Sequence, residues 1–345
     1  MGKIGILLIN LGTPDATDYW SMRRYLKQFL SDKRVIESKG PIWWLIFNGI
    51  ILTRRPRSSG RAYDLIWNKE RDESPLRTIT RAQSDKVAAL FADQEQIVVD
   101  WAMRYGTPSI DQRIARLTEQ GCERILFFPL YPQYSSATTG TAMDSAFDAL
   151  KTLRNQPTIR TIAPYFNRAA YITALAESIR THHASLPWKP EVLIASLHGL
   201  PVDFIAKGDP YQSQCEETVD LLREELGLTD WQLLLTYQSR TGRTEWIGPD
   251  TEETIQRLAQ DGIKNLSIVA PGFSADCVET LEELGLRAVA KFKQEGGKNC
   301  TVVPCLNESD ASISMLETLI AENLQGWNRT REGAKITQRP LSPLH

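Results

Sequence analysis

Histidine is scarce in this chain, so the imidazoles that could do chemistry can be sorted by their positions. Among four histidines, His345 ends the sequence and His182-His183 close a predicted helix, where a positive charge favours the helix dipole without any function. His198 is different because it follows the apolar run Val192–Leu197. An imidazole at the end of a buried strand can be a general base or a metal ligand, or it can be purely structural, and these interpretations stay open.

Carboxylates form a second group, after the apolar run Leu266–Ala270. Glu279 stands three residues after Asp276, which is the spacing of a capping box, so its carboxylate could simply hold the start of a helix. Glu283 lies about one turn beyond Glu279, and stacked carboxylates repel unless a cation or a proton lies between them. A row of carboxylates that leads into a cleft would suit the delivery of a cation.

Three further segments combine hydroxyl, aromatic and guanidinium groups, namely residues 104–108, 127–140 and 238–249. None contains a phosphate-binding glycine loop, a nucleophile elbow or a dinucleotide-binding fingerprint. Nucleotide-dependent and acyl-transfer enzymes are therefore disfavoured.

Short β-branched or apolar runs alternate with amphipathic helical patterns, which predicts an α/β fold with parallel sheets and crossover helices. Eight strands are expected, and they fit two sheets of four better than one sheet. Ser74-Pro75 and Thr107-Pro108 each place a hydroxyl at a helix N-cap and proline at the first helical position. The expected strands are Ile4–Ile9, Gln96–Met103, Arg124–Leu130, Ile159–Ala163, Val192–Ser196, Gln232–Tyr237, Leu266–Ala270 and Thr301–Val303.

The two halves of the chain share a weak repeat, which lays Arg116 and Gly121 on Arg257 and Gly262. Gene duplication and two convergent βα units explain it equally well. If the repeat is real, the loops after the two matched strands lie at equivalent carboxyl ends of parallel strands. Ligands of open α/β sheets bind at such ends.

The long apolar stretch Ile42–Leu52 is too short to span a membrane. A buried helix is the commoner explanation for such a run, and an apolar lip over a greasy ligand or a bilayer surface is the alternative. Arginines follow at once and form either a solvated face or a receptor for carboxylates. They are Arg54, Arg55, Arg57 and Arg61.

The composition of the chain limits the classes of protein to which it can belong. The 345 residues carry 40 Lys and Arg against 42 Asp and Glu, a net charge of −2, so binding to nucleic acid through bulk charge is not expected. A chain of this length usually forms two domains. Five cysteines without a C-x-x-C pair, and no targeting segment, predict a cytoplasmic protein with reduced thiols.

Eight ordered motifs resemble those of ferrochelatases, the enzymes that insert Fe²⁺ into protoporphyrin IX to make protohaem at the end of haem synthesis. The resemblance runs from Gly5 to about Leu306. The motifs lie at residues 7–14, 103–106, 131–140, 196–201, 208–211, 237–240, 246–249 and 274–281.

The resemblance implies two Rossmann-like domains, each a four-stranded parallel sheet flanked by helices, with the porphyrin in the cleft between them. The expected domains are residues 1–163, with the lip at about 41–63, and residues 164–308. Residues 309–345 would form a C-terminal helix and tail that pack back on the first domain.

By the same resemblance, His198 and Glu279 are the catalytic and metal-binding pair, facing each other across the macrocycle, and Glu283 is a metal-binding carboxylate on the access path. Further positions would line or shape the porphyrin pocket or its propionate end and mouth. They are Arg104, Tyr105, Tyr134, Ser135 and Trp246 for the pocket, and Arg55 and Tyr63 for the mouth.

Two positions depart from the family pattern. Many relatives carry histidine where Cys277 stands, and some bind a [2Fe–2S] cluster through a cysteine-rich tail, whereas residues 307–345 contain no cysteine. Because such clusters need four thiolates, no cluster is expected, and Fe²⁺ enters only as a substrate. A coproporphyrin or cobalt chelatase and a non-catalytic porphyrin-binding protein remain alternatives. The apolar lip favours protoporphyrin IX and leaves peripheral membrane contact open.

Overall fold

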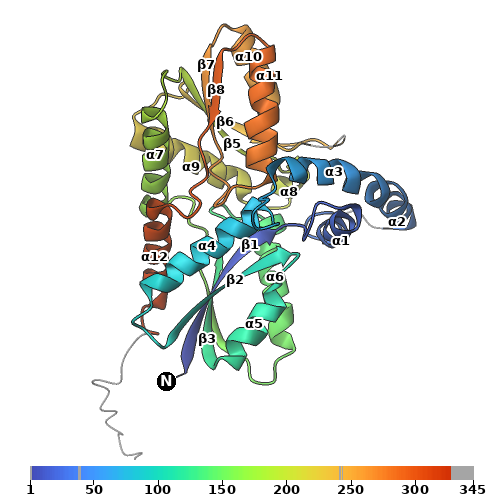
Figure 1. Ribbon diagram of the computed structural model, residues 1–345, viewed down its shortest axis with the longest axis vertical. Coiled ribbons are helices and arrows are strands. Elements are labelled where there is room, and N and C mark those ends of the chain that lie inside the picture. Colours follow the sequence, from blue (N-terminus) through green and yellow to red (C-terminus); the bar gives the residue numbers. More distant parts are fainter. Residues whose placement is uncertain (1, 38–39, 241, 243, 328–345) are drawn as a thin grey trace, which may run out of the picture.

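The computed structural model describes residues 2–37, 40–240, 242 and 244–327 (Figure 1). It contains two four-stranded sheets in which every ladder is parallel, with strand orders β2-β1-β3-β4 and β6-β5-β7-β8. The predicted α/β fold with two sheets of four is confirmed. The strands are β1 (Lys3–Gly12), β2 (Ile97–Tyr105), β3 (Cys122–Pro129), β4 (Thr158–Thr161), β5 (Val192–His198), β6 (Leu233–Gln238), β7 (Asn265–Val269) and β8 (Asn299–Val302).

Helices cover both faces of each sheet, and three of the helical segments are π-helices, a rare type that is frequent at functional sites. The first half contains α1 (Tyr19–Leu30), α2 (Pro41–Ile46), η1 (Phe47–Ile51), α3 (Leu52–Ile66), α4 (Pro75–Leu90), α5 (Ile110–Glu119), η2 (Ser136–Gly140) and α6 (Thr141–Lys151). The second contains α7 (Ala169–Ala184), α8 (Val202–Ala206), α9 (Tyr211–Leu226), α10 (Thr251–Gln260), η3 (Glu279–Ala288), α11 (Val289–Gln294) and α12 (Asp310–Leu324).

Strand β1 shows why the sheets are buried on both faces. Ile4, Ile6 and Leu8 point into one large core that also takes in the second sheet, whereas Leu7 and Ile9 point into a separate core under α5 and α6. Successive strand residues point to opposite faces, so a continuously apolar strand needs cover on both sides. Because the large core is shared, the two halves pack as one body. Helix α12 lies beside α4 and α7 and joins them (Figure 1).

The repeat has a structural counterpart. The two sheets have the same strand order, and α5 and α10 occupy equivalent places, at residues 110–119 and 251–260. Gly121 and Gly262, which follow these helices, both have positive φ, as expected for glycines that end a helix. Common topology strengthens the case for duplication.

One of the two predicted helix caps is confirmed. Ser74 caps α4 through Arg77 N, with Pro75 in the first turn. The prediction at Thr107-Pro108 is wrong, because α5 begins two residues later with a capping box between Ser109 and Gln112. The reciprocal hydrogen bonds of that box satisfy two N–H groups, which a single hydroxyl at Thr107 could not do.

Of the two interpretations of residues 42–52, a buried helix or an exposed apolar lip, the structure contradicts the buried helix. Helices α2, η1 and α3 run on without a break and project from the body of the protein beside α1 (Figure 1). Ile42, Trp44 and Leu45 are 62–74% exposed, whereas Phe47 and Leu52 face α1 and are buried. The segment is therefore an exposed apolar lip anchored along one side.

His182 and His183 are structural histidines in a neutral form. Their Nε2 atoms lie 2.8 Å from Thr301 Oγ1 and 2.9 Å from Ser267 Oγ. Burial lowers the pKa of both imidazoles, which favours their neutral form at the end of α7. Among the histidines that the structure describes, His198 alone lies outside such packing. His345 lies outside the described residues.

Candidate active site

His198 ends β5, at the carboxyl edge of the second sheet, with its side chain exposed. Its Nδ1 lies 2.6 Å from the carbonyl oxygen of Gly199. A carbonyl can only accept a hydrogen bond, so Nδ1 carries the proton and the lone pair of Nε2 is left to take up a proton or a metal ion. The strand thus presents Nε2 of this imidazole as the ring atom that can act in the way the sequence hypothesis requires.

Gln238 connects His198 to the helix that carries Glu279. It ends β6 directly beside His198, and its Oε1 accepts a hydrogen bond of 2.7 Å from Ser196 Oγ. Its Nε2 donates to the carbonyl oxygen of Glu279 at 3.0 Å. Sequence reasoning missed this role, although a glutamine at the end of a buried strand signals a polar group that needs internal partners.

The helix η3 begins at Glu279 without a side-chain cap, so the predicted capping box with Asp276 is wrong. Asp276 instead accepts hydrogen bonds from Thr280 Oγ1 at 2.9 Å and from Asn307 Nδ2 at 2.6 Å. These partners tie the loop before η3 to the loop after β8. The carboxylate of Glu279 is therefore not needed to hold the start of the helix.

Glu279 lies against the helices of the lip. Its neighbour Val278 packs into the cluster that α1 and α3 form. Burial raises the pKa of Tyr25 and of Tyr63, and the negative charge of Glu279 adds to the effect. Both phenols therefore keep their protons near neutral pH. The second half thus brings a carboxylate to the buried tyrosines of the first half.

Cys277 is buried beside this carboxylate. Burial, and next the charge of Glu279, raises the pKa of the thiol well above its usual range. A thiol that stays protonated is a poor metal ligand, because the thiolate is the ligating form.

Glu283 is engaged by the neighbouring loop. Its two oxygens accept hydrogen bonds from Ser239 N at 2.8 Å and Ser239 Oγ at 2.7 Å, and Arg287 lies 3.7 Å away. A hollow of about 170 Å³ adjoins it, lined among others by Arg240 and Asp250. A cation at Glu283 would have to displace Ser239, so its metal-binding role stays a prediction.

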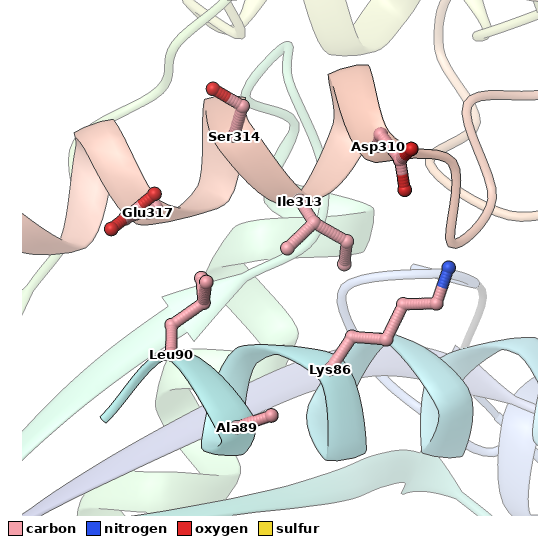
Figure 2. A pocket seen from close by; sticks show the side chains of 7 residues that line it. All are labelled: Lys86, Ala89, Leu90, Asp310, Ile313, Ser314 and Glu317. Atoms are coloured by element: carbon pink, nitrogen blue, oxygen red, sulfur yellow. The ribbon is translucent and has the colours of Figure 1, made fainter. Parts of the chain in front are cut away.

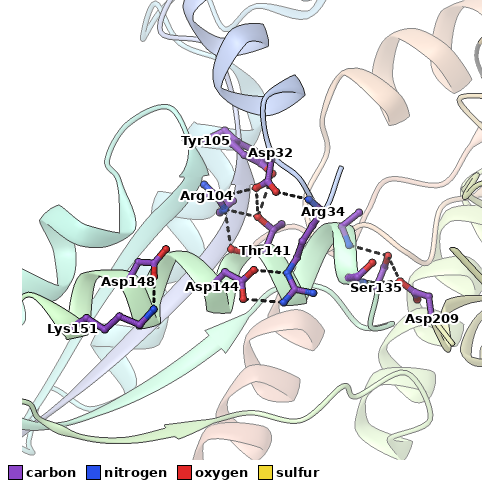
Figure 3. A network of polar contacts seen from close by, with 12 residues as sticks. Asp32, Arg34, Arg104, Tyr105, Ser135, Thr141, Asp144, Asp148, Lys151 and Asp209 are labelled. Atoms are coloured by element: carbon purple, nitrogen blue, oxygen red, sulfur yellow. Dashed lines mark hydrogen bonds and ion pairs between the residues drawn. The ribbon is translucent and has the colours of Figure 1, made fainter. Parts of the chain in front are cut away.

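Arg104 and Tyr105 belong to a polar network at the end of β2 (Figure 3). Asp32, which follows α1, accepts hydrogen bonds from the Arg104 guanidinium, from Tyr105 Oη at 2.9 Å and from the Thr141 hydroxyl. Arg104 Nε also donates to Thr141 O at 2.9 Å. Tyr105 is fully buried, so it can shape a pocket from behind but offers no surface to a ligand. Sequence reasoning missed Asp32, because its separation in sequence from Arg104 and Tyr105 matches no known motif.

The other predicted pocket positions are spread around the same edge. Ser135 is buried and donates to Asp209 Oδ2 at 3.0 Å (Figure 3), and Tyr134 is half-buried. Trp246 lies above Gly199, where a Cβ would come within 3.2 Å of the indole. At the lip, Tyr63 packs edge-on against Tyr25 with ring centroids 6.4 Å apart, and Arg55 is exposed.

A larger hollow, of about 350 Å³, lies between α4 and α12 (Figure 2). Its lining residues include none of the predicted site positions, and Lys86 on its rim donates to the carbonyl oxygen of Glu308 at 2.6 Å. Within the described ranges, no three His, Cys, Asp or Glu side chains are grouped so that they could hold a metal ion. No helix in the same part of the chain is both long and apolar enough to cross a membrane.

Solved structures that include a chelatase share this fold. SirB from Bacillus subtilis, solved with Fe³⁺, superposes on this chain with a TM-score of 0.55 at 12% sequence identity. The superposition covers 93% of this chain and 95% of the SirB chain. The sirohydrochlorin chelatase SirB from Bacillus subtilis subspecies spizizenii, solved with cobalt, gives a TM-score of 0.54 at 9% identity, with 94% and 96% coverage. Such identities show the fold alone.

The sequence narrows this class to one family. Residues 3–324 match the ferrochelatase family. The ferrochelatase of Rhodopseudomonas palustris (strain BisA53) is 54% identical over 94% of both chains, and that of Chelativorans sp. (strain BNC1) is 52% identical over 94% of this chain and 92% of its own. The chain belongs to the ferrochelatase family. It is an enzyme of haem synthesis, a lyase that inserts ferrous iron into a porphyrin.

Proposed function

We propose that His198 and Glu279 perform the metal insertion, His198 as the base and Glu279 as the carboxylate that receives Fe²⁺. A free-base porphyrin loses two pyrrole protons as one Fe²⁺ enters, so the site must both accept protons and hold a cation. The observation that carries the proposal is the imidazole of His198, whose Nε2 lone pair is left available by the hydrogen bond at Nδ1. Each accepted proton then leaves to solvent through the exposed ring.

The remaining predicted positions have supporting parts in this proposal. Arg104 and Tyr105, both bonded to Asp32, form the end wall of the pocket. Tyr134 and Ser135 form a side wall, and Trp246 covers Gly199 next to His198. Arg55 and Tyr63 mark the mouth, and Glu283 passes the cation inward once Ser239 releases it. We take residues 1–163 and 164–308 as the two domains and α12 as the C-terminal helix. The predicted tail after Trp327 lies outside the described residues.

We propose protoporphyrin IX as the porphyrin. Its support is the exposed apolar lip of α2, which suits vinyl groups better than two additional propionates. We expect kcat/KM for Fe²⁺ insertion to be about 10-fold or more higher with protoporphyrin IX than with coproporphyrin III, because burying each extra carboxylate is unfavourable. Steady-state rates measured side by side under anaerobic conditions check this. Equal or faster turnover of coproporphyrin, or preference for Co²⁺, would favour the alternative chelatases.

We propose that the lip also contacts a membrane containing anionic lipids. Exposed Trp44 and Leu45 lie close in sequence to a cluster of exposed arginines on α3, and apolar and basic groups together suit an anionic bilayer surface. In a flotation assay with vesicles that contain an anionic phospholipid, wild type should float, and the double variant Trp44→Ser/Leu45→Ser should not. Trp231→Ser, at a tryptophan 61% exposed on the second half, is the matched control. A wild-type protein wholly in the dense fraction rules the contact out.

We propose a reducing cytoplasmic setting and no iron–sulfur cluster. The five cysteines are all free thiols, and four of them are buried. Burial raises the pKa of Cys300 to about 12 and that of Cys305 well above its usual range, so neither offers a ready thiolate. The absorption spectrum of anaerobically purified protein should lack sulfide-to-iron charge-transfer bands. Such bands, with bound sulfide found on analysis, would show a cluster.

A further inference from the structure

The 208–211 motif belongs to the sequence resemblance but to no step of the proposed chemistry. In the structure this motif lies at the boundary between the two halves. Residues 133–136 of the first half contact α9 and the loop that precedes it. Four consecutive residues each donate a hydrogen bond across this boundary. They are Gln133 Nε2 to Thr218 Oγ1 at 2.9 Å, Tyr134 N to Gln214 Oε1 at 2.7 Å, Ser135 Oγ to Asp209 Oδ2 at 3.0 Å and Ser136 N to Asp209 Oδ2 at 2.7 Å.

Asp209 is the strongest of these partners. Its Oδ2 accepts both hydrogen bonds from the first half, and its Oδ1 accepts a third from Tyr211 N at 3.1 Å. Hydrogen bonds to an ionised carboxylate are about twice as strong as neutral ones. Ser135 Oγ also accepts a hydrogen bond from Ala137 N at 3.2 Å, so the carboxylate holds the residue that caps η2.

The same short loop reaches the proposed base. Tyr211 is buried and packs in the same core cluster as Leu197 and Leu200, which lie on either side of His198 in the chain. Asp209, Pro210 and Tyr211 therefore connect the Ser135 wall of the cleft to the strand end that presents the imidazole. Figure 3 shows the Ser135–Asp209 contact at the boundary.

We propose that Asp209 and Gln214 are positioning residues for metal insertion, which set the gap between the Tyr134–Ser135 wall and His198. The proposal rests on the roles proposed above for these residues. Insertion requires the ring to lie at a defined distance from the base, and a displacement of about 1 Å can lower a rate about 100-fold. Because the two walls belong to different halves, a contact that joins both walls directly holds this distance better than the shared core behind them.

Gln214 offers a chemically clean test. Gln214→Met keeps the length of the side chain and removes the strong acceptor for Tyr134 N, whereas Gln214→Glu keeps an acceptor at the same place. Asp209→Ala removes all three hydrogen bonds of the carboxylate. Lys86→Met is the matched control, because Lys86 also joins the halves, through Glu308 O, but lies between α4 and α12, away from the cleft (Figure 2).

We expect Gln214→Met and Asp209→Ala to lower kcat for Fe²⁺ insertion about 10- to 100-fold, with the KM for porphyrin changed less than about threefold. Gln214→Glu should restore kcat to within about threefold of wild type, and Lys86→Met should leave it unchanged. Thermal unfolding of each variant separates this effect from lost folding. If Asp209→Ala does not fold, the Gln214 pair decides alone.

Unchanged kcat in folded Gln214→Met, an equal loss in Lys86→Met, or failure of Gln214→Glu to restore activity would overturn the proposal. The proposed role of His198 is judged separately, by His198→Ala. If that variant retains insertion, the proposed base is wrong whatever the Asp209 and Gln214 variants do. If it loses insertion while the Asp209 and Gln214 variants do not, only the positioning role is wrong.

Discussion

His198→Ala should lower the rate of Fe²⁺ insertion by about 100- to 10,000-fold while porphyrin still binds. The physical reason is that Nε2 of this imidazole is the unoccupied proton acceptor at the end of β5, held in one tautomer by the carbonyl of Gly199. Alanine removes the acceptor and leaves the backbone of the strand in place. Stopped-flow absorption at the Soret band measures the rate, and quenching of porphyrin fluorescence measures binding.

The control for this variant is His182→Gln. His182 is neutral, bonds to Thr301 and lies on α7, so the amide can keep its hydrogen bond and the rate should stay within about twofold of wild type. If His198→Ala retains a third or more of the wild-type rate, the assignment of the base is wrong.

Glu279→Gln should lower insertion by about 100- to 1,000-fold, with a raised apparent KM for Fe²⁺. The amide has the size of the carboxylate but no charge, so it keeps the packing against α1 and α3 and loses attraction for the cation. The hydrogen bond from Gln238 to the backbone carbonyl of residue 279 is unaffected by the change. Initial rates across a range of Fe²⁺ concentrations separate the effect on KM from the effect on kcat.

Glu282→Gln is the matched control on the same helix. Its carboxylate pairs with Arg287 at 3.0 Å instead of facing the tyrosines of the lip, so insertion should change less than about threefold. Equal losses in the two variants would mean that η3 contributes only its general negative charge. A Glu279→Gln enzyme as fast as wild type would remove the carboxylate from the mechanism.

The architecture was predictable from the sequence because its signals are local and strong. The central strands are short apolar runs, as burial on both faces requires, whereas the edge strands β4 (Thr158–Thr161) and β8 (Asn299–Val302) are more polar and less buried. His198 was identifiable for the same reason, since it directly follows such a run. The cap at Ser74 was predictable from two adjacent residues, whereas Thr107 failed because the next hydroxyl, Ser109, makes the better cap.

Composition alone left two environments open for the apolar lip. Apolar composition shows that a segment avoids water but does not show what covers it, so a buried helix and an exposed lip both fitted Ile42 and Trp44, which the structure leaves exposed. Which side chains of the lip are covered depends on the tertiary structure, and α1 packs against the lip along one side only.

The polar partners of the site were hidden for a related reason. Asp32 reaches Arg104 and Gln238 reaches Glu279 from distant parts of the chain, and no spacing relates such pairs. The capping box at Asp276 failed because Thr280 and Asn307 compete for its carboxylate. Hydrogen bonds between distant segments therefore carry the part of the site that a single sequence does not reveal.

Anaerobic insertion of Fe²⁺ into protoporphyrin IX by wild type, His198→Ala and Glu279→Gln tests the central claim most directly. Loss of porphyrin fluorescence and the shift of the Soret band report product. The account predicts turnover by wild type and its near abolition in both variants, each of which still binds porphyrin. Turnover that survives in either variant, or a wild type that binds porphyrin tightly and inserts no iron, would contradict it.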